Sequence, residues 1–203
     1  MKIFCIGRNY ALHAKELGNA IPESPVVFMK PVTALLKNNM PFFYPEFSQS
    51  IEFEAELVLK IAKNGKHIQA KFARDYYDEI TVGIDFTARD LQSKLKEKGL
   101  PWELAKAFDQ SAVLGEFTSI KALDTQDAIA FSLKKNGSNV QEGNSKDVLF
   151  KFDELICFIS QYFTLQTGDL IYTGTPEGVG KIAIGEKYEG FLEGKKVFEC
   201  EIK

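Results

Sequence analysis

Three glutamates at alternating positions open the stretch IEFEAELVLKI, residues 51–61. Side chains two residues apart share one face of a strand, whereas on a helix they point to different sides. A strand here would bring Glu54 and Glu56 together beside an apolar run, where the two carboxylates would repel each other. A hard divalent cation with oxygen ligands would relieve that repulsion. The alternative is an ordinary strand whose glutamates face solvent.

Asp85 is a candidate third carboxylate for the same cation. It ends the apolar run VGID, and the following TARD (87–90) has the pattern of a capping box, with Thr87 as N-cap and Asp90 three residues later. Asp85 would then lie at the end of a strand and beside the N-terminus of a helix, which is a common place for ligand sites. Its alternative role is to cap the approach to that helix.

Two further segments carry groups for acid–base or electrostatic catalysis. His13 and Glu16 would share one face of a short helix that Asn9 caps and that runs to Leu17. Glu16 could orient His13 as a general base, although a lone helix histidine is often structural. Lys106 lies in the apolar stretch LPWELAKAF, where an ammonium group either reaches water or holds an anion.

The glycine-rich stretch TGTPEGVGK, residues 173–181, is not a phosphate-binding P-loop. Five residues separate Gly174 from Gly180 instead of four, and Ile182 follows Lys181 where that motif needs serine or threonine. The backbone amides and threonine hydroxyls of this loop could hold a carboxylate. The alternative is a surface turn.

Short elements must position these groups. We expect strands at 2–6, 26–29, 82–86 and 169–173, hairpins at 129–142 and 187–202, and helices at 70–79, 87–98 and 146–163. The first hairpin would turn at Asn136-Gly137, and Ser145 would cap the last helix. The composition of 51–61 suits helix as well as strand. Short strands between a few separated helices indicate an α+β fold with a mixed or antiparallel sheet.

Composition limits the class of protein. The 203 residues are enough for one domain with a substantial core, and the net charge of −3 argues against nucleic acid and anionic membranes as partners. Cys5, Cys157 and Cys200 are far apart and form no CxxC pair, so we expect free thiols in a reducing compartment. The N-terminus does not resemble a signal peptide, and no apolar run approaches a membrane span. These features predict a cytoplasmic protein.

Six blocks in order resemble the fumarylacetoacetate hydrolase superfamily, specifically its short branch of acylpyruvate hydrolases and oxaloacetate decarboxylases. The blocks are GRNYALHAKEL (7–17), FMKP (28–31), EAELVL (54–59), GIDFTARDLQ (83–92), KGLPWELAKAFD (98–109) and GDLIYTGTPEGVG (168–180). The resemblance favours the strand for 51–61. It implies one catalytic domain over 1–203, a mixed β-sheet roll or sandwich with a few peripheral helices, a mobile lid helix at about 9–18, and a homodimer.

The resemblance also implies roles for individual residues. Glu54, Glu56 and Asp85 match ligands of a divalent metal, usually Mg²⁺ with Mn²⁺ or Ca²⁺ as substitutes. Lys106 matches the lysine that stabilises the enolate, and His13 and Glu16 match a dyad that activates water. The positions that match substrate contacts are Arg89, Gln92, Thr173, Gly174 and Thr175, and further candidates in the matching blocks are Arg8, Asn9, Tyr10 and Lys30. Two features depart from the family pattern: the extra carboxylate Glu52, and the stretch FDQSAVLG after Lys106.

The implied reaction is hydrolysis of a 3-acylpyruvate, of the acetylpyruvate or fumarylpyruvate type, to pyruvate and a carboxylic acid through a metal-bound enolate. We place it first because a dyad that activates water suits hydrolysis. Oxaloacetate decarboxylation or tautomerisation comes second, and isomerisation of a 2-hydroxyhepta-2,4-diene-1,7-dioate type third. A non-catalytic metal-binding protein is the alternative from another class, but it would not need His13, Glu16 and Lys106.

Overall fold

The largest sheet of the protein mixes parallel and antiparallel strands, as the α+β prediction requires. The computed structural model describes residues 1–16, 18 and 20–203. The sheet follows the order β2-β1-β12-β5-β6-β8-β3, with β9 also pairing with β6. Its strands are β1 (Ile3–Gly7), β2 (Val26–Lys30), β3 (Leu35–Leu36), β5 (Ala55–Ile61), β6 (Tyr77–Asp85), β8 (Ala112–Leu114), β9 (Thr118–Ser119) and β12 (Leu170–Tyr172). The pairs β1–β12 and β3–β8 are parallel, and the other pairs are antiparallel.

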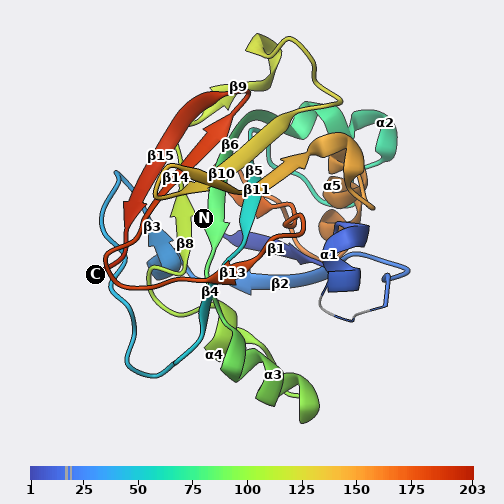
Figure 1. Ribbon diagram of the computed structural model, residues 1–203. Coiled ribbons are helices and arrows are strands. Elements are labelled where there is room, and N and C mark those ends of the chain that lie inside the picture. Colours follow the sequence, from blue (N-terminus) through green and yellow to red (C-terminus); the bar gives the residue numbers. More distant parts are fainter. Residues whose placement is uncertain (17, 19) are drawn as a thin grey trace.

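Two smaller sheets complete the β-structure. One follows the order β11-β10-β14-β15, and the other the order β13-β4-β7. Their strands are β4 (Ile51–Phe53), β7 (Thr87–Ala88), β10 (Ala130–Lys135), β11 (Ser138–Asn144), β13 (Gly180–Lys181), β14 (Lys187–Leu192) and β15 (Lys195–Glu201). Strands β10, β14 and β15 contact β5 and β6, so the four-stranded sheet covers the centre of the largest one (Figure 1). The apolar side chains between them form the core, among them Leu57, Leu59, Val82, Ile84, Leu133 and Phe198.

The helices are short and lie at the periphery of the sheets. They are α1 (Ala11–Glu16), α2 (Ala70–Ala73), α3 (Arg89–Glu97), α4 (Glu103–Lys106) and α5 (Phe152–Tyr162), with 3₁₀ turns at Val32–Ala34, Arg74–Tyr76, Ile120–Ala122 and Ser145–Asp147. Helices α3 and α4 project together from one end of the sheets, and α2 packs beside α5 elsewhere (Figure 1). Within the described residues, every helix is too short to span a bilayer.

Several sequence predictions are confirmed. The first hairpin turns at Asn136-Gly137, whose φ angles of 50° and 83° are those of a type I′ turn. The C-terminal hairpin and the loop 174–180 also form where expected. Helix α3 ends at Glu97, one residue before the predicted end, and Gly99 follows with a φ of 63°.

Two predicted helices are wrong in extent. The helix expected at 70–79 ends at Ala73 and continues only as the 3₁₀ turn Arg74–Tyr76, because the chain enters β6 at Tyr77, which pairs with Ile61 and is buried. The helix expected at 146–163 begins at Phe152. Before it, the chain is held in extended form: Val148 forms a β-bridge with Tyr10, and the Leu149 N–H donates to the Asn9 carbonyl. In both cases long-range pairing overrides local helix propensity.

The three predicted helix caps are also wrong. The Asn9 side chain accepts from the Phe150 N–H and donates to the Thr173 carbonyl, so it joins distant segments instead of capping α1. The Thr87 hydroxyl donates to the Asp85 carbonyl. The Ser145 hydroxyl accepts from the Ile129 N–H. The predicted end of the first helix at Leu17 lies outside the described residues.

Candidate active site

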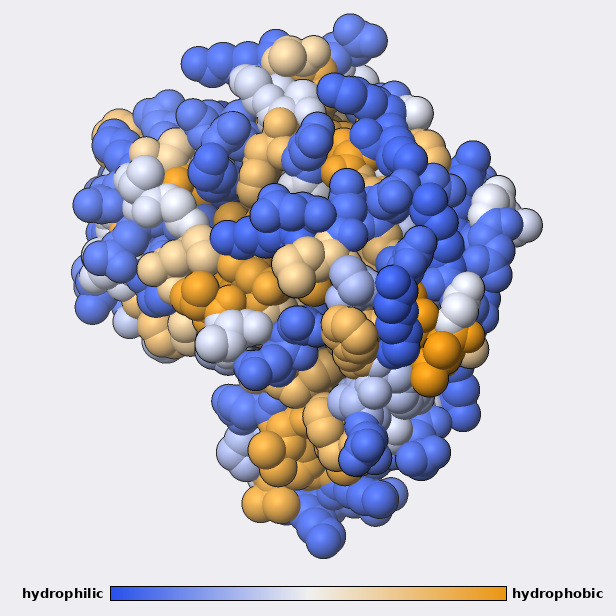
Figure 2. Space-filling model, turned by 90° about the vertical axis from the view of Figure 1, so that its left-hand side faces the viewer, coloured by the Kyte–Doolittle hydropathy of each residue, from blue (hydrophilic) through white to orange (hydrophobic). Residues whose placement is uncertain are grey.

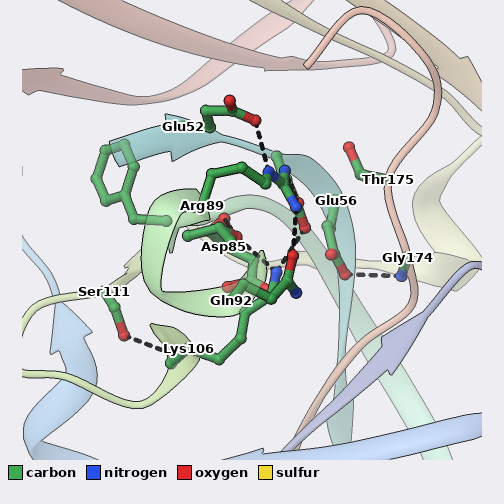
Figure 3. A network of polar contacts seen from close by, with 12 residues as sticks. Glu52, Glu56, Asp85, Arg89, Gln92, Lys106, Ser111, Gly174 and Thr175 are labelled. Atoms are coloured by element: carbon green, nitrogen blue, oxygen red, sulfur yellow. Dashed lines mark hydrogen bonds and ion pairs between the residues drawn. The ribbon is translucent and has the colours of Figure 1, made fainter. Parts of the chain in front are cut away.

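Two crossings of the chain between sheets create the carboxylate cluster. Glu54 lies between β4 of the three-stranded sheet and β5 of the largest sheet, and Asp85 ends β6 two residues before β7 begins. The Asp85 N–H donates to the Glu54 carbonyl at 2.8 Å, which fixes the two crossings side by side. Glu56 follows on β5. One carboxylate oxygen from each of the three residues lies within 4.8 Å of the others, and all three residues are buried (Figure 3).

Two lysines lie against this cluster. Lys106 Nζ is 2.7 Å from Glu54 Oε2 and 2.8 Å from Asp85 Oδ2, and it also donates to the Thr87 hydroxyl at 2.6 Å. Lys30 Nζ is 2.7 Å from Asp85 Oδ1. Burial alone would lower the pKa of Lys106, but Asp85 and Glu54 raise it above its usual range, so the ammonium stays charged.

Arg89 links the cluster to the extra glutamate of the sequence. Its Nε is 2.7 Å from Glu52 and its Nη2 is 2.5 Å from Glu54, so Glu52 lies at the rim of the site, paired with Arg89 (Figure 3). Burial alone would raise the pKa of Glu54, but Lys106 and Arg89 together hold it well below its usual range. The strong ion pairs therefore keep Glu54 ionised.

Glu56 has no such cationic partner among the described residues. Its carboxylate accepts the Gly174 N–H at 2.7 Å. Burial raises its pKa well above the ordinary value, and the charges of Asp85 and Glu54 raise it further. The cluster is therefore short of positive charge on the Glu56 side. Three hard oxygen donors with this deficit fit a divalent cation such as Mg²⁺, Mn²⁺ or Ca²⁺, with Glu54, Glu56 and Asp85 as the residues that would hold it.

A cavity lies beside the carboxylate cluster, with Glu54, Glu56 and Asp85 in its wall. His13 and Glu16 come together next to it, as their spacing predicts. His13 is 4% exposed and lines the cavity, and its Nδ1 is 3.4 Å from Glu16 Oε2. Glu16 also accepts the Gly178 N–H at 3.1 Å, which ties α1 to the glycine-rich loop. Burial lowers the pKa of His13, although Glu54 and Glu16 partly offset this. A neutral imidazole beside the carboxylate cluster can accept a proton.

Four of the predicted substrate contacts line the same cavity. Arg89, Gln92 and Thr175 line it together with Arg8. The Gln92 amide oxygen accepts from Arg89 at 2.7 Å, which confirms that these two residues share one face of α3. Gly174 adjoins the cavity with a φ of 103°, and a Cβ there would lie 2.6 Å from the Asn9 Cβ. Only glycine fits this position without strain.

Four other candidates do not line the cavity, and they hold the segments around it in place. The Thr173 hydroxyl donates to the Leu57 carbonyl at 2.9 Å, and the Tyr10 hydroxyl donates to the Asn144 carbonyl. Asn9 holds the Phe150 and Thr173 backbone. Lys30 is buried beneath Asp85. Substrate contact by these four residues stays a prediction.

Sequence reasoning missed five residues of the cavity wall and one that supports it. The five that line the cavity are Ile6, Gly7, Phe28, Lys96 and Trp102. Gln141 donates from its amide to the Thr175 hydroxyl at 2.9 Å and accepts from the Ala55 N–H. Lys96 had a readable signal, because it follows Gln92 by four residues on the same helix face. Gln141 had none, since only the long-range pairing of the sheets brings it near.

Comparison with known proteins identifies relatives of this chain. Residues 2–203 match the family model described as fumarylacetoacetate (FAA) hydrolase C-terminal. The chain is 40% identical to the mitochondrial oxaloacetate tautomerase of Arabidopsis thaliana over 202 residues, covering 100% of this chain and 91% of the relative. It is 39% identical to the oxaloacetate tautomerase of Escherichia coli K12, covering 95% and 89%. A crystal structure of fumarylpyruvate hydrolase from Pseudomonas aeruginosa, in complex with Mn²⁺ and pyruvate, superimposes with a TM-score of 0.93 at 34% identity, covering 100% and 89%.

Proposed function

The chain belongs to the fumarylacetoacetate hydrolase family, and from this premise we propose that it is a metal-dependent oxaloacetate keto–enol tautomerase. The observation that carries the proposal is the buried cluster of Glu54, Glu56 and Asp85 beside Lys106 and His13, in a chain about 40% identical to two oxaloacetate tautomerases along nearly its whole length. The names of these relatives favour the second of the reactions that the sequence suggested over the first.

The chemistry of the reaction explains the residue types. A divalent cation, which we propose is Mg²⁺ with Mn²⁺ as a substitute, would supply Lewis-acid polarisation of the 2-oxo group. In the keto form, C3 loses a proton as O2 gains one, and the reverse transfer restores the ketone. The charged Lys106 ammonium donates a hydrogen bond to O2 as negative charge develops there. Neutral His13 accepts the proton from C3 and delivers it to O2 to give the enol, and in the reverse direction it takes the O2 proton and returns it to C3. Glu16 orients the ring and stabilises the imidazolium.

Tautomerisation also gives the His13–Glu16 dyad a role without water. A proton must leave and return at carbon, and this is slow without a positioned base. The Gly174 N–H holds Glu56, and the hydroxyl of the neighbouring Thr175 lines the cavity, where it can donate to the substrate carboxylate. Gln92 and Arg89 form the opposite wall of the cavity.

The test is a spectroscopic assay of enol-oxaloacetate with purified protein, Mg²⁺ and, separately, excess EDTA. Free divalent cations themselves accelerate the reaction, so the rate without protein at the same Mg²⁺ concentration is subtracted. We expect metal-dependent loss of the enol absorbance that Asp85→Asn abolishes. If the wild type and Asp85→Asn proteins give the same rate, the proposal fails.

Hydrolysis of a 3-acylpyruvate is the second candidate. It is favoured by the likeness to a fumarylpyruvate hydrolase in complex with Mn²⁺ and pyruvate, and by a dyad that can take a proton from water. Acetylpyruvate provides the test, because its hydrolysis yields pyruvate and acetate in equal amounts. Stoichiometric pyruvate release, faster than the turnover of oxaloacetate, would make hydrolysis the main activity.

We also propose a cytoplasmic homodimer. The described chain carries its cysteines as free thiols, which suits a reducing compartment. A mainly apolar groove lies beside α3 and α4, and Figure 2 shows apolar side chains on this projecting end. Its lining residues are Met29, Lys30, Pro31, Phe47, Leu91, Glu103, Leu104, Ala107 and Phe108. Leu104 is 71% exposed, and such a patch suits association. Light scattering should find a dimer that Leu104→Glu weakens and that Ile184→Glu, a matched change at a residue 72% exposed outside the groove, leaves intact.

A further inference from the structure

Two cationic side chains that the proposed reaction does not use line the cavity. Arg8 follows β1 directly, and Lys96 lies in the last turn of α3. Both line the cavity that contains the carboxylate cluster. Within the described part of the chain, neither side chain lies within 4 Å of a carboxylate, and the buried Nε of Arg8 has no hydrogen-bond partner. A buried donor without a partner is costly, which points to a ligand that supplies the acceptor.

The backbone aims both side chains at the cavity. Arg8 has a φ of 61°, a left-handed conformation that costs a non-glycine residue free energy and that recurs at binding sites. Arg89, Gln92 and Lys96 are spaced i, i+3 and i+7, so they share one face of α3. The Trp102 ring lies 5.3 Å from Lys96 Nζ and limits where that ammonium can lie.

The two cations also affect each other. Burial lowers the pKa of Lys96 to about 8, and the charge of Arg8 is the next cause, ahead of Arg89 and Lys106. Glu54 of the same cavity partly offsets this, but among the described residues it pairs with Arg89 and Lys106, so Arg8 and Lys96 remain available to an anion. By contrast, Arg89 and Lys106 are already paired with carboxylates of the cluster.

We call the region of Arg8 and Lys96 the outer site and the carboxylate cluster the inner site. The balance of charges differs between the two. Around the cluster, the carboxylates Glu52, Glu54, Glu56 and Asp85 face the cations Lys30, Arg89 and Lys106, which leaves one negative charge. A divalent cation would turn this into one positive charge. One carboxylate of the substrate neutralises that charge, so a second carboxylate needs cations elsewhere.

We infer that Arg8 and Lys96 bind the second carboxylate of a 2-oxo dicarboxylate and so select dianionic over monoanionic 2-oxo acids. This inference rests on the proposed function for the inner end of the site. Trp102 and Phe28, whose ring centroids are 5.9 Å apart, form the apolar wall between the two ends. The selected class is therefore a short substrate with a carboxylate at each end. The loss of either Arg8 or Lys96 weakens binding of the carboxylate that lies farther from the metal ligands.

The test compares oxaloacetate with its 4-methyl ester, which keeps the 2-oxo acid and loses the second charge. Both kcat/KM in the enol assay and Kd by calorimetry are measured with Mg²⁺ for the wild type, Arg8→Gln and Lys96→Gln. Hydrogen bonds to charged groups predict that each substitution lowers the dianion-to-ester ratio by about 10-fold or more. Lys94→Gln, an exposed lysine on the same helix, is the matched control and should leave the ratio unchanged.

The outcomes separate the inference from the proposed function. An unchanged dianion-to-ester ratio in both variants overturns the inference, even if the wild type turns over oxaloacetate. Absence of turnover by the wild type overturns the proposed function, and the ratio of Kd values then decides on the outer anion site by itself. Because two variants on separate elements are used, misfolding of one, detected by thermal denaturation, still leaves the other to decide.

Discussion

Replacing Glu56 by glutamine should stabilise the metal-free protein and abolish its response to metal. Glu56 is a fully buried carboxylate whose one donor among the described residues is the Gly174 N–H, and Asp85 and Glu54 raise its pKa. The amide of Glu56→Gln keeps an oxygen for Gly174 and offers N–H donors to the two neighbouring carboxylates. The substitution therefore removes an uncompensated charge while it keeps the shape of the side chain.

The expected difference in the free energy of unfolding between Glu56→Gln and the wild type has opposite signs with and without metal. Relief of an unpaired buried group is worth about 2 kcal/mol, which raises the Tm of a chain of this size by about 4–8 °C. Conversely, Mg²⁺ at about 100 times its Kd stabilises the wild type by about 2.7 kcal/mol. The glutamine variant should gain little from Mg²⁺, since it lacks one of three ionised ligands. The two melting curves should therefore exchange order when Mg²⁺ is added.

Differential scanning calorimetry at pH 7, with EDTA and with Mg²⁺, measures this exchange. Glu52→Gln is the matched control, because Glu52 pairs with Arg89 at the rim and is not one of the three clustered ligands. A raised folded-state pKa means that ionised Glu56 costs stability at pH 7, and the cost vanishes as the pH falls toward the ordinary value of 4.5. The gain from Glu56→Gln should shrink over the same range. A metal-free variant less stable than the wild type, or one that keeps the full Mg²⁺ response, would refute the reasoning.

Three further predictions concern the groups around the cluster. Lys106→Met should lower kcat/KM by about 100-fold or more. The Mg²⁺-induced rise in Tm should be larger than in the wild type, because Glu54 and Asp85 lose a competing cation. A smaller rise than in the wild type would contradict this explanation. Burial lowers the pKa of His13, so the acid limb of the pH–rate profile should lie below 6.5 and vanish in His13→Gln; a limb above 6.5 contradicts this. Gly174→Ala should cost about 2–4 kcal/mol of unfolding free energy, since its Cβ meets Asn9 at 2.6 Å; urea denaturation showing less than about 1 kcal/mol contradicts this.

The sequence predicts the clustering of the three carboxylates well because period-two spacing is a local property. Glu54 and Glu56 can be placed on one face from their spacing, and Asp85 from its position at the end of an apolar strand. Hairpins with Asn-Gly turns are local in the same way. The break in the strand at Glu54 could not be seen in the sequence, because it arises from pairing of β4 with β7 and β13.

Long-range contacts account for the failures. Asn9 has the residue type of a cap, yet its side chain satisfies backbone groups more than 140 positions away. The same holds for the segment 146–151, which pairs with the chain near Tyr10 instead of extending α5. Residue type records that a side chain can bond to backbone, but it does not record which backbone the fold brings close.

The crossings at Glu54 and Asp85 also set where this chain can change length during evolution. A single insertion between residues 51 and 56 would turn Glu56 to the opposite face of β5, since side chains alternate along a strand. The segment 123–128 carries no such constraint, because it is a largely exposed connection outside the helices and strands of the described chain. Descendants of this sequence should therefore vary in length at that connection, while the spacing of the two glutamates stays fixed.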